Sequence, residues 1–311
     1  MPASDRRSPL RRALVACRTS LGAAIAEVIA RAPALEAPFV RISRRAARRP
    51  GLVFGLCWAV NTRLNECLRA RDTRFRQVTI GPHRVWLDVT DQSGFDAYFY
   101  GHLYEPILTA TLLQHLHDGD VFVDIGANAG LFSMLAAKLV GPSGRVIAFE
   151  PHPGARAEMM RLLDRNAVAD RVDVVSAALS DRDGHTASLH ITSRSGLSTL
   201  DPSVAPGRFD SVYAETVTVA VTTLDAWMAP HPDLPSRIAL IKIDVEGLED
   251  RVVSGMLETL RRAPEVTIVC ETSEDSAADR LLTGAGFDAA TLEPPDGAYL
   301  GNRLYSRRRA R

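Results

Sequence analysis

The stretch VFVDIGANAGLFSMLAAKLVGPSGRVIAFEPHP, residues 121–153, decides the fold class of this chain. It begins with an apolar run, 121–125, that has the length and composition of a buried strand. A glycine turn from Gly126 to Gly130, a helical pattern over 130–140 and a second apolar run over 145–149 follow. The acid Glu150 ends the second run. Strand, turn, helix, strand and acid in this order are typical of the first unit of a nucleotide-binding α/β domain.

The turn narrows the choice of ligand. In an open parallel sheet, ligands bind beyond the carboxyl ends of the strands, which places Asp124, Gly126 and Gly130 at the binding edge. Glu150, 20 residues past Gly130, can accept both ribose hydroxyls of an adenosine. Neither G-x-G-x-x-G nor a P-loop occurs, and Asp124 would repel a pyrophosphate. S-adenosylmethionine, with an ammonium group, one carboxylate and a ribose, fits the turn better than a dinucleotide.

The rest of the chain continues the alternation of strands and helices. We expect further strands at 172–176, 238–243, 266–271, 286–291 and 299–306, and helices at 154–166, 249–262 and 276–284. This pattern predicts an α/β fold with a mainly parallel sheet covered by helices on both faces. Residues 180–225 depart from it, because two alternating runs flank a loop rich in Ser, Gly and Pro; we expect an inserted hairpin and loop there.

The first part of the chain is organised differently. Residues 10–30 and 52–71 have helical patterns, with Pro33 and Pro38 ending the first. Residues 77–91 alternate around Gly81-Pro82 and predict a β-hairpin. We therefore expect a mostly helical N-terminal extension over 1–76 and a larger domain over 77–311. In that domain the hairpin and a lid-like helix over 77–118 would precede the sheet core at 119–311.

Charge is distributed unevenly along the chain. Residues 1–76 contain 16 arginines, no lysine and five acids, a net charge of +11, so the other residues carry −11. Such an arm indicates a solvated helical extension or, alternatively, peripheral contact with anionic membranes. We do not expect a nucleic-acid partner, and the oligomeric state is not indicated. The four scattered cysteines and the lack of a signal peptide or membrane span predict a cytoplasmic protein.

Several segments together resemble the FkbM family of S-adenosylmethionine-dependent methyltransferases. They are GDVFVDIGANAGLFSMLAAKLVGPSGRVIAFEPHP, VDVVSAALSDRDG, SGLSTL, VTTLDAW and IALIKIDVEGLEDRVVSGM. The resemblance runs from about residue 78 to residue 287 and implies the class I, Rossmann-like methyltransferase fold. That fold has a seven-stranded sheet whose last strand is antiparallel. Residues 1–76 lie outside the resemblance.

The resemblance also implies roles for particular residues. Asp124 and the turn residues would surround the methionine part of the cofactor, and Glu150 would hold the ribose. Ala177, Ala178 and Leu179, expected to end the third strand, would line the adenine pocket. His152 stands where family members commonly have Asn. The implied cofactor contacts in and beside the turn are Asp124, Gly126, Ala127, Asn128 and Gly130.

Three carboxylates are expected to converge at neighbouring strand ends. Asp244 and Glu246 follow the strand at 238–243, and Glu271 ends the strand at 266–271. One interpretation makes Asp244 or Glu246 the general base that takes a proton from an acceptor hydroxyl. Another makes the group an oxygen-ligand site for Mg²⁺, which is an alternative and not the expectation. In a third, Glu246 caps the next helix and pairs with Lys242 or Arg251.

Two loops are candidates for substrate contact. The aromatic stretch YFYGHLYEP, 98–106, is a candidate lid, in which His102 could act as a base and Glu105 could reach the cofactor's amino group. The polar loop SRSGLSTLDPSVAPGRF, 193–209, is expected to gate the substrate, because loops on a rigid scaffold carry specificity. Its candidate substrate residues are Ser195, Gly196, Ser198 and Thr199.

These observations predict an S-adenosylmethionine-dependent methyltransferase. The resemblance favours O-methylation of a hydroxyl on a sugar, glycolipid or secondary metabolite, so the expected partner is a small-molecule or glycan acceptor. N-methylation of a peptide or amino sugar is the first alternative. A nucleic-acid-directed enzyme using the basic arm is the second, but the fourth strand ends in IDVEG and not in an N-P-P-Y-type motif.

Overall fold

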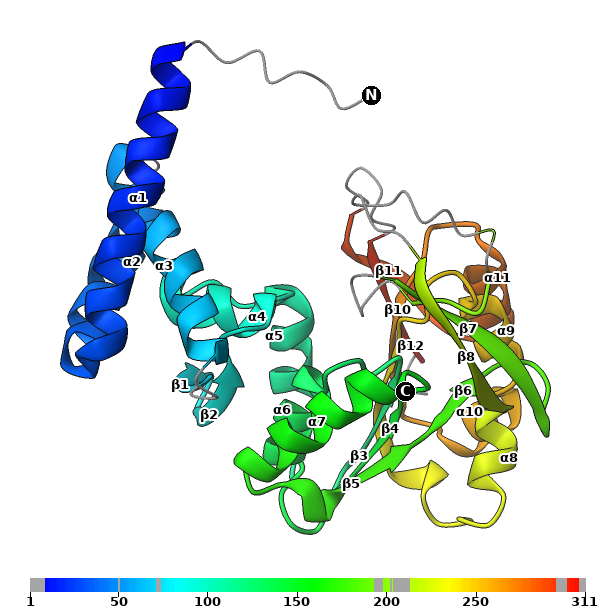
Figure 1. Cartoon of the computed structure of the whole chain (residues 1–311). Helices are drawn as coiled ribbons and strands as arrows, with labels where there is room; N and C mark the ends of the chain where they lie inside the picture. The colour runs from blue at the N-terminus through cyan, green and yellow to red at the C-terminus, as the bar shows by residue number, and fades with distance from the viewer. Residues whose placement is uncertain are drawn as a thin grey trace. The chain divides into compact units, whose positions relative to one another are not determined.

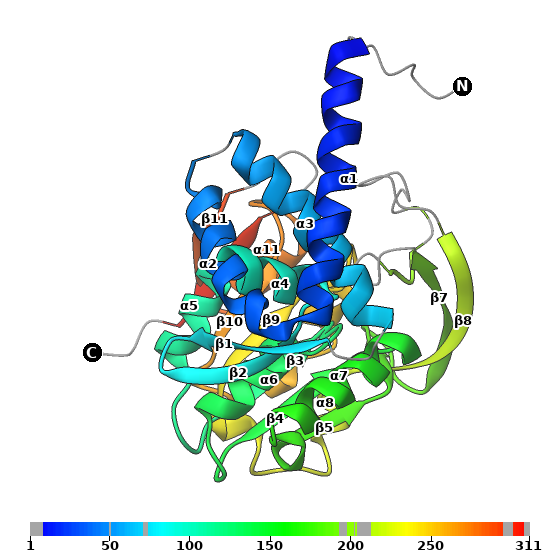
Figure 2. The same cartoon turned by 60° about the vertical axis from the view of Figure 1, so that its left-hand side comes forward.

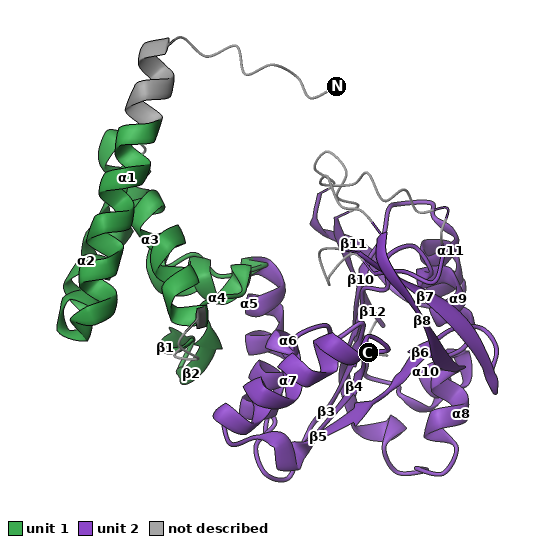
Figure 3. Cartoon of the chain, viewed as in Figure 1, with its two compact units in different colours: residues 1–106 green, residues 107–311 purple. Residues whose placement is uncertain are grey.

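A computed structural model describes residues 9–49, 51–70, 74–192, 198–201, 203, 213–294 and 301–307. The chain forms two compact units, residues 1–106 and 107–311 (Figure 3). No helix in the described ranges is long and apolar enough to cross a membrane.

Unit 1 consists mainly of helices. Its elements are α1 (Pro9–Arg31), the 3-10 turn η1 (Pro33–Leu35), α2 (Glu36–Ala47), α3 (Leu52–Ala70), β1 (Phe75–Ile80), β2 (His83–Asp88), α4 (Gln92–Phe95) and the π-helical turn η2 (Asp96–Tyr100). The strands form the predicted antiparallel hairpin, with Ile80 opposite His83. Helix α2 was not predicted from the sequence. Pro38 lies in its first turn, where a missing N–H breaks no helical hydrogen bond, so this proline does not prevent a helix.

A buried charged network joins three elements of unit 1. Glu36 at the start of α2 accepts hydrogen bonds from the Arg76 guanidinium on β1, at 2.5 and 2.9 Å, and from the Tyr98 hydroxyl on η2, at 2.7 Å. The hairpin thus folds with the helices, and the unit boundary lies at 106. The boundary predicted at 76 differs because it was placed where the helical patterns end and the hairpin begins, and local patterns do not report these contacts.

Unit 2 is built on a seven-stranded sheet of order β11-β12-β10-β9-β3-β4-β5. These strands are β3 (Val121–Ile125), β4 (Arg145–Phe149), β5 (Val172–Val175), β9 (Ile238–Ile243), β10 (Thr267–Glu271), β11 (Asp288–Glu293) and β12 (Asn302–Ser306). β3, β4, β5, β9 and β10 are parallel, whereas β12 runs antiparallel to β10 and β11. This order confirms the predicted class I methyltransferase fold. β3 lies between β4 and β9, where the strand order reverses, and this is where such sheets bind ligands.

Helices cover both faces of this sheet. In Figures 1 and 2, α6 (Leu131–Leu139) and α7 (Pro153–Arg165) lie on one face. On the other face lie α8 (Leu224–Met228), α9 (Glu249–Ser254), α10 (Leu257–Arg262) and α11 (Ala277–Gly284). α5 (Pro106–His115) precedes the sheet in the chain. Because the strands are covered on both sides, β3 and β10 are buried along their whole length.

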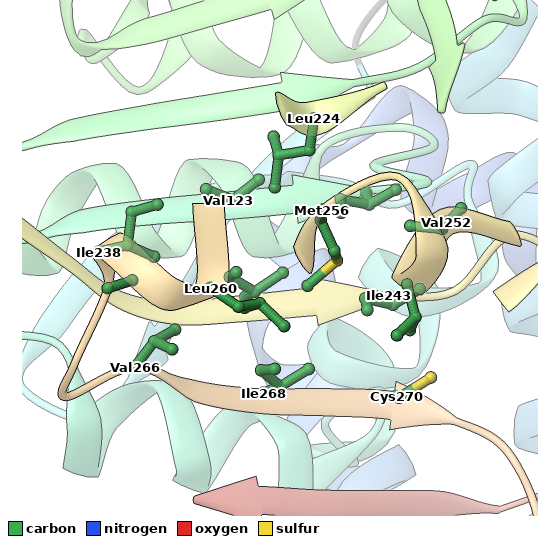
Figure 4. Close-up of a cluster of buried hydrophobic side chains, with 14 of the residues drawn as sticks. Val123, Leu224, Ile238, Ile243, Val252, Met256, Leu260, Val266, Ile268 and Cys270 are labelled. Atoms are coloured by element: carbon green, nitrogen blue, oxygen red, sulfur yellow. The ribbon is translucent and has the colours of Figure 1, made fainter. Parts of the chain in front are cut away.

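A large core cluster fills the space beneath α8, α9 and α10 (Figure 4). Val123, Ile243 and Ile268 from the strands pack with Met256 and Leu260 from the helical side, and all are at most 1% exposed. Burying side chains of this size stabilises the fold by about 1.5–3 kcal/mol each. The cluster fixes β9 beside β3 and β10, so it sets the positions of their carboxyl ends.

Two details of unit 2 differ from the predicted elements. The helix expected over 249–262 is interrupted at Gly255 and Met256, where a Cβ on Gly255 would overlap the main-chain oxygen of Ser180. The insertion forms a separate three-stranded sheet of order β6-β8-β7, from β6 (Ala177–Leu179), β7 (His185–Thr192) and β8 (Tyr213–Thr222). The predicted hairpin is β7 with β8, and β6 adds to it in parallel.

Candidate active site

The turn between β3 and α6 is held by a buried ionic group. Asp124 is 0% exposed; one of its oxygens accepts a hydrogen bond from Ser133 at 2.6 Å, and the other lies 3.8 Å from the Lys242 ammonium. Lys242 also donates to the main-chain oxygen of Gly126 at 3.2 Å and pairs with Asp244 at 3.0 Å. Burial raises the pKa of Asp124, and Lys242 opposes that rise.

This burial changes the interpretation of Asp124. It was predicted to contact the cofactor, but in this structure its side chain has no exposed surface and contacts Ser133 and Lys242 instead. The sequence pattern indicates Lys242 only as a partner for Glu246. Lys242 is 4% exposed and lies on β9, a central parallel strand. A charged residue within an otherwise apolar strand is rarely buried without a partner, and this was the signal in the sequence that Lys242 has one.

Gly126 can only be glycine in this arrangement. Its φ of 78° lies in the left-handed region, and a Cβ there would overlap the main-chain oxygen of Asp244. The first strand's turn and the KIDVEG segment are therefore in direct contact. Asn128 in the same turn also has a left-handed φ, 49°. Its side-chain oxygen is buried without a hydrogen-bond partner in the described chain, as is Asp124 Oδ1.

Glu150 closes the same edge of the sheet. Its two carboxylate oxygens accept the main-chain N–H groups of Asn128 and His152, each at 2.7 Å. The residue is 7% exposed, and burial raises its pKa although both amides oppose that rise. A carboxylate has about four acceptor positions, so two remain for hydroxyl donors. The glutamate is thus fixed in place before any ligand arrives.

Ala177, Ala178 and Leu179 do not lie where they were predicted. They form β6 of the small sheet and do not end β5, which stops at Val175. Leu179 belongs to the core cluster of the large sheet, and Ala178 packs with Leu189 and Val221 of the small sheet. The side chains of Ala178 and Leu179 are thus buried in these two cores, because the chain changes sheets after Val175.

The three predicted carboxylates do meet. Carboxylate oxygens of Asp244, Glu246 and Glu271 lie within 4.8 Å of one another at the carboxyl ends of β9 and β10. Asp244 is hydrogen-bonded to Glu271 on one side and paired with Lys242 on the other. Glu246 has a left-handed φ of 57°, so this short segment turns sharply directly after the strand.

A fourth acid, missed in the sequence, shapes this segment. Glu249 accepts the main-chain N–H groups of Val245 and Gly247, at 3.3 and 3.1 Å, and is 7% exposed. Glu249 thus holds the turn that precedes α9 and does not cap this helix, whose N-cap residue Leu248 makes no side-chain capping hydrogen bond. The capping role that one interpretation gave to Glu246 stays a prediction. An acid at the start of a helical pattern was the available signal.

The insertion contributes one of its predicted residues to this segment. Thr199 donates its hydroxyl to the main-chain oxygen of Glu246 at 2.9 Å and bonds to His190 of β7 through both main-chain groups. Ser198 precedes it, with a buried hydroxyl that has no partner in the described chain. Ser195 and Gly196 lie outside the described residues. His102 and Glu105 belong to unit 1, and their roles stay predictions.

Comparison with known proteins agrees with this geometry. The profile of the methyltransferase FkbM domain matches residues 124–288, more than half of the chain. The chain belongs to the FkbM methyltransferase family. It is an S-adenosylmethionine-dependent methyltransferase, as the glycine turn and the family resemblance predicted.

Relatives are found in bacteria and fungi. The chain is 32% identical over 223 residues to the 31-O-demethyl-FK506 methyltransferase FkbM of Streptomyces tacrolimicus, covering 62% of this chain and 84% of that protein. It is 30% identical over 202 residues to Methyltransferase 1 of Beauveria bassiana (strain ARSEF 2860), covering 60% and 80%. The crystal structure of methyltransferase FkbM from Methylobacillus flagellatus KT aligns with a TM-score of 0.41 at 15% identity, covering 86% of this chain and 58% of that one.

The residues at this edge of the sheet fit S-adenosylmethionine, the cofactor of this family. The buried oxygen of Asn128 lacks a donor, and Glu150 keeps acceptor capacity beside it. An adenosine with a charged amino acid tail supplies hydroxyl and ammonium donors to such acceptors.

Replacing Glu150 with alanine is expected to weaken S-adenosylhomocysteine binding by about 1.5–3 kcal/mol for each lost hydrogen bond to the carboxylate. Glu150→Gln is a matched control because glutamine keeps one acceptor oxygen, so this variant should lose less affinity for S-adenosylhomocysteine. Titration calorimetry of the three proteins checks this. Unchanged affinity in Glu150→Ala would remove the residue from the binding site.

The pKa of Glu271 predicts how stability depends on pH. Burial, and next the neighbouring Asp244, raise it to about 9, so Glu271 is protonated at neutral pH in the folded state. The folded state then binds more protons than the unfolded state between about pH 4.5 and 9, and unfolding free energy falls across this window. Glu271→Gln should lack this contribution. Urea unfolding at several pH values should therefore give the variant the shallower decline; parallel curves would contradict the assignment.

Proposed function

We propose that this FkbM methyltransferase methylates a hydroxyl of a small polyhydroxylated acceptor, such as a sugar, a glycolipid or a secondary metabolite. The observation that carries the proposal is the cluster of three carboxylates formed by Asp244, Glu246 and Glu271. The main chain of Asp244 is in contact with Gly126 of the glycine turn, so the cluster lies beside that turn. A hydroxyl is a poor nucleophile until a base takes its proton, and these carboxylates are placed to do so. The Streptomyces tacrolimicus relative, whose name refers to a 31-O-demethyl compound, supports oxygen as the methylated atom.

The neighbours of Asp244 suit it to the role of base. Lys242 fixes one of its oxygens at 3.0 Å, and protonated Glu271 hydrogen-bonds to the carboxylate from the other side. The side chain is therefore oriented before an acceptor binds, which contributes to rate by positioning. Glu150 and Asn128 would hold the cofactor, which supplies an electrophilic methyl group when bound. The acceptor's proton would pass to an oxygen of Asp244.

The same group could hold a divalent cation, but Lys242 argues against it. An ammonium group 3.0 Å from Asp244 already neutralises one of the three carboxylates, and protonation neutralises Glu271. Mg²⁺ prefers several ionised oxygen ligands in near-octahedral geometry. We therefore propose metal-independent base catalysis.

The test uses acceptors in matched pairs. Sugars and polyols are incubated with the enzyme and S-adenosylmethionine, each beside its derivative with every hydroxyl converted to a methyl ether. S-adenosylhomocysteine should form only with free hydroxyls. Turnover of the fully etherified acceptors at the same rate would refute the proposal, because these offer no proton for the carboxylates.

We also propose a cytoplasmic setting. The four cysteines, Cys17, Cys57, Cys67 and Cys270, are all free thiols, and two of them are buried. Burial raises the pKa of Cys270 well above its usual value, so that thiol is inert. Free thiols of this kind persist in a reducing compartment.

A further inference from the structure

Unit 1 carries most of the exposed large apolar side chains. Ten are exposed in the described chain, and seven lie between residues 21 and 58: Leu21, Val28, Leu35, Ile42, Leu52, Val53 and Trp58. Leu52 and Val53 are the most exposed, at 79% and 62%. Scattered apolar residues on a surface are ordinary, but two adjacent ones left this open at the start of a helix are not covered by their own unit.

Arginines surround these two residues. The end of α2 and the start of α3 form what we call the basic tip, defined by the exposed residues Arg41, Ile42, Arg45, Arg48, Arg49, Leu52 and Val53. No acid occurs between Glu36 and Glu66. Arg44 is not included, because it donates to the main-chain oxygen of Tyr98 at 3.0 and 2.8 Å.

Helix α2 presents the arginines away from its own core. Glu36, Val40 and Ser43 recur at helical spacing and are buried. Arg41 and Arg45 follow the same spacing on the opposite side, with Ile42 beside them, and all three are exposed. Arg48 and Arg49, also exposed, directly follow the end of the helix. Leu52 and Val53 follow Arg49 by only three and four residues, so the last arginines and the apolar pair lie close together.

We propose that the basic tip docks on an anionic phospholipid bilayer, with Leu52 and Val53 entering the headgroup region and the arginines contacting phosphates. Arginines beside an apolar anchor are the pattern of peripheral membrane contact. Charge complementarity selects an anionic lipid, since each basic residue near such a surface adds attraction. A nucleic acid would satisfy the arginines but offers nothing to an exposed leucine and valine.

The test is sedimentation of the full chain with phosphatidylcholine vesicles, with and without phosphatidylglycerol. Binding is expected only with the anionic lipid and should fall steeply with salt, because exposed charges are screened within about 10 Å at 0.1 M. Leu52→Ser/Val53→Ser should weaken binding about tenfold or more. Arg48→Gln/Arg49→Gln should weaken it about fivefold for each charge removed.

Matched variants in unit 2 control for general surface effects. Met160→Ser removes an apolar side chain that is 42% exposed on α7, and Arg182→Gln removes an arginine whose side chain is 83% exposed. Both should bind vesicles as the wild type does. Helix content, measured by circular dichroism, should be unchanged in all four variants, which shows that the helical unit 1 has folded; affinity for S-adenosylhomocysteine should also be unchanged, which shows the same for unit 2.

Three outcomes would overturn the proposal. One is equal sedimentation with neutral and anionic vesicles. Another is wild-type binding by Leu52→Ser/Val53→Ser. The third is binding of single-stranded RNA that depends on Arg48 and Arg49 but not on the apolar pair, together with no vesicle binding; this would assign the tip to a polyanion.

Discussion

The single-turnover rate of methyl transfer is expected to fall by about 10²–10⁴ when Asp244 is replaced by asparagine. Asparagine keeps the size of the side chain and an oxygen for Lys242, but it cannot accept a proton. Glu150 and Asn128 are unaffected, so S-adenosylhomocysteine affinity should barely change. A rapid-quench measurement with saturating acceptor separates the chemical step from product release.

Glu246→Gln is the matched variant for this experiment. It changes another carboxylate of the same cluster. Asp244, which Lys242 contacts at 3.0 Å, is the proposed base, so we expect the smaller loss from Glu246→Gln. EDTA should leave the wild-type rate unchanged. If EDTA abolishes methyl transfer and added Mg²⁺ restores it, the carboxylates hold a metal ion and do not act as a base. Near-wild-type rates in both variants would exclude these carboxylates and direct the search to His102.

Replacing Gly126 with alanine is expected to abolish S-adenosylhomocysteine binding and to destabilise unit 2. A left-handed conformation alone costs an alanine about 1–2 kcal/mol. The added Cβ would also overlap the main-chain oxygen of Asp244, so the turn and the KIDVEG segment could not both keep their positions. Thermal unfolding and calorimetry on the same preparations would report both losses.

Gly184→Ala separates the cost of the left-handed conformation from the cost of the overlap with Asp244. Gly184 has a similar φ, 73°, but a Cβ there would meet no atom within 4 Å. This variant should lose only the conformational part, about 1–2 kcal/mol, and bind S-adenosylhomocysteine normally. Equal losses in the two variants would mean that the contact between Gly126 and Asp244 is unimportant.

Much of the fold could be predicted because its signals are local. The apolar runs at 121–125 and 238–243 are strands, as predicted. The seven strands of the large sheet have the arrangement that the family resemblance implied. Helix α2 was missed because Pro33 and Pro38 were interpreted as breaks, whereas Pro38 occupies a first turn. The place of Ala177–Leu179 was missed because changing from one sheet to another leaves no mark in the pattern.

The site was predictable in its residue types but less so in its contacts. Asp244, Glu246 and Glu271 follow strand ends and were expected to converge, as they do. That Asp124 is fully buried, and that Lys242 links it to Asp244, depends on how β3 and β9 align. Such pairs come from long-range packing, which spacing along one strand cannot report.

The central claim, methylation of oxygen by this FkbM methyltransferase, is tested most directly by locating the transferred methyl group. An amino sugar that carries both hydroxyl and amine groups is incubated with S-adenosylmethionine labelled with ¹³C in its methyl group, and the product is examined by NMR. The account predicts a labelled methyl ether, with no label on nitrogen. A labelled N-methyl group on the same acceptor would contradict it.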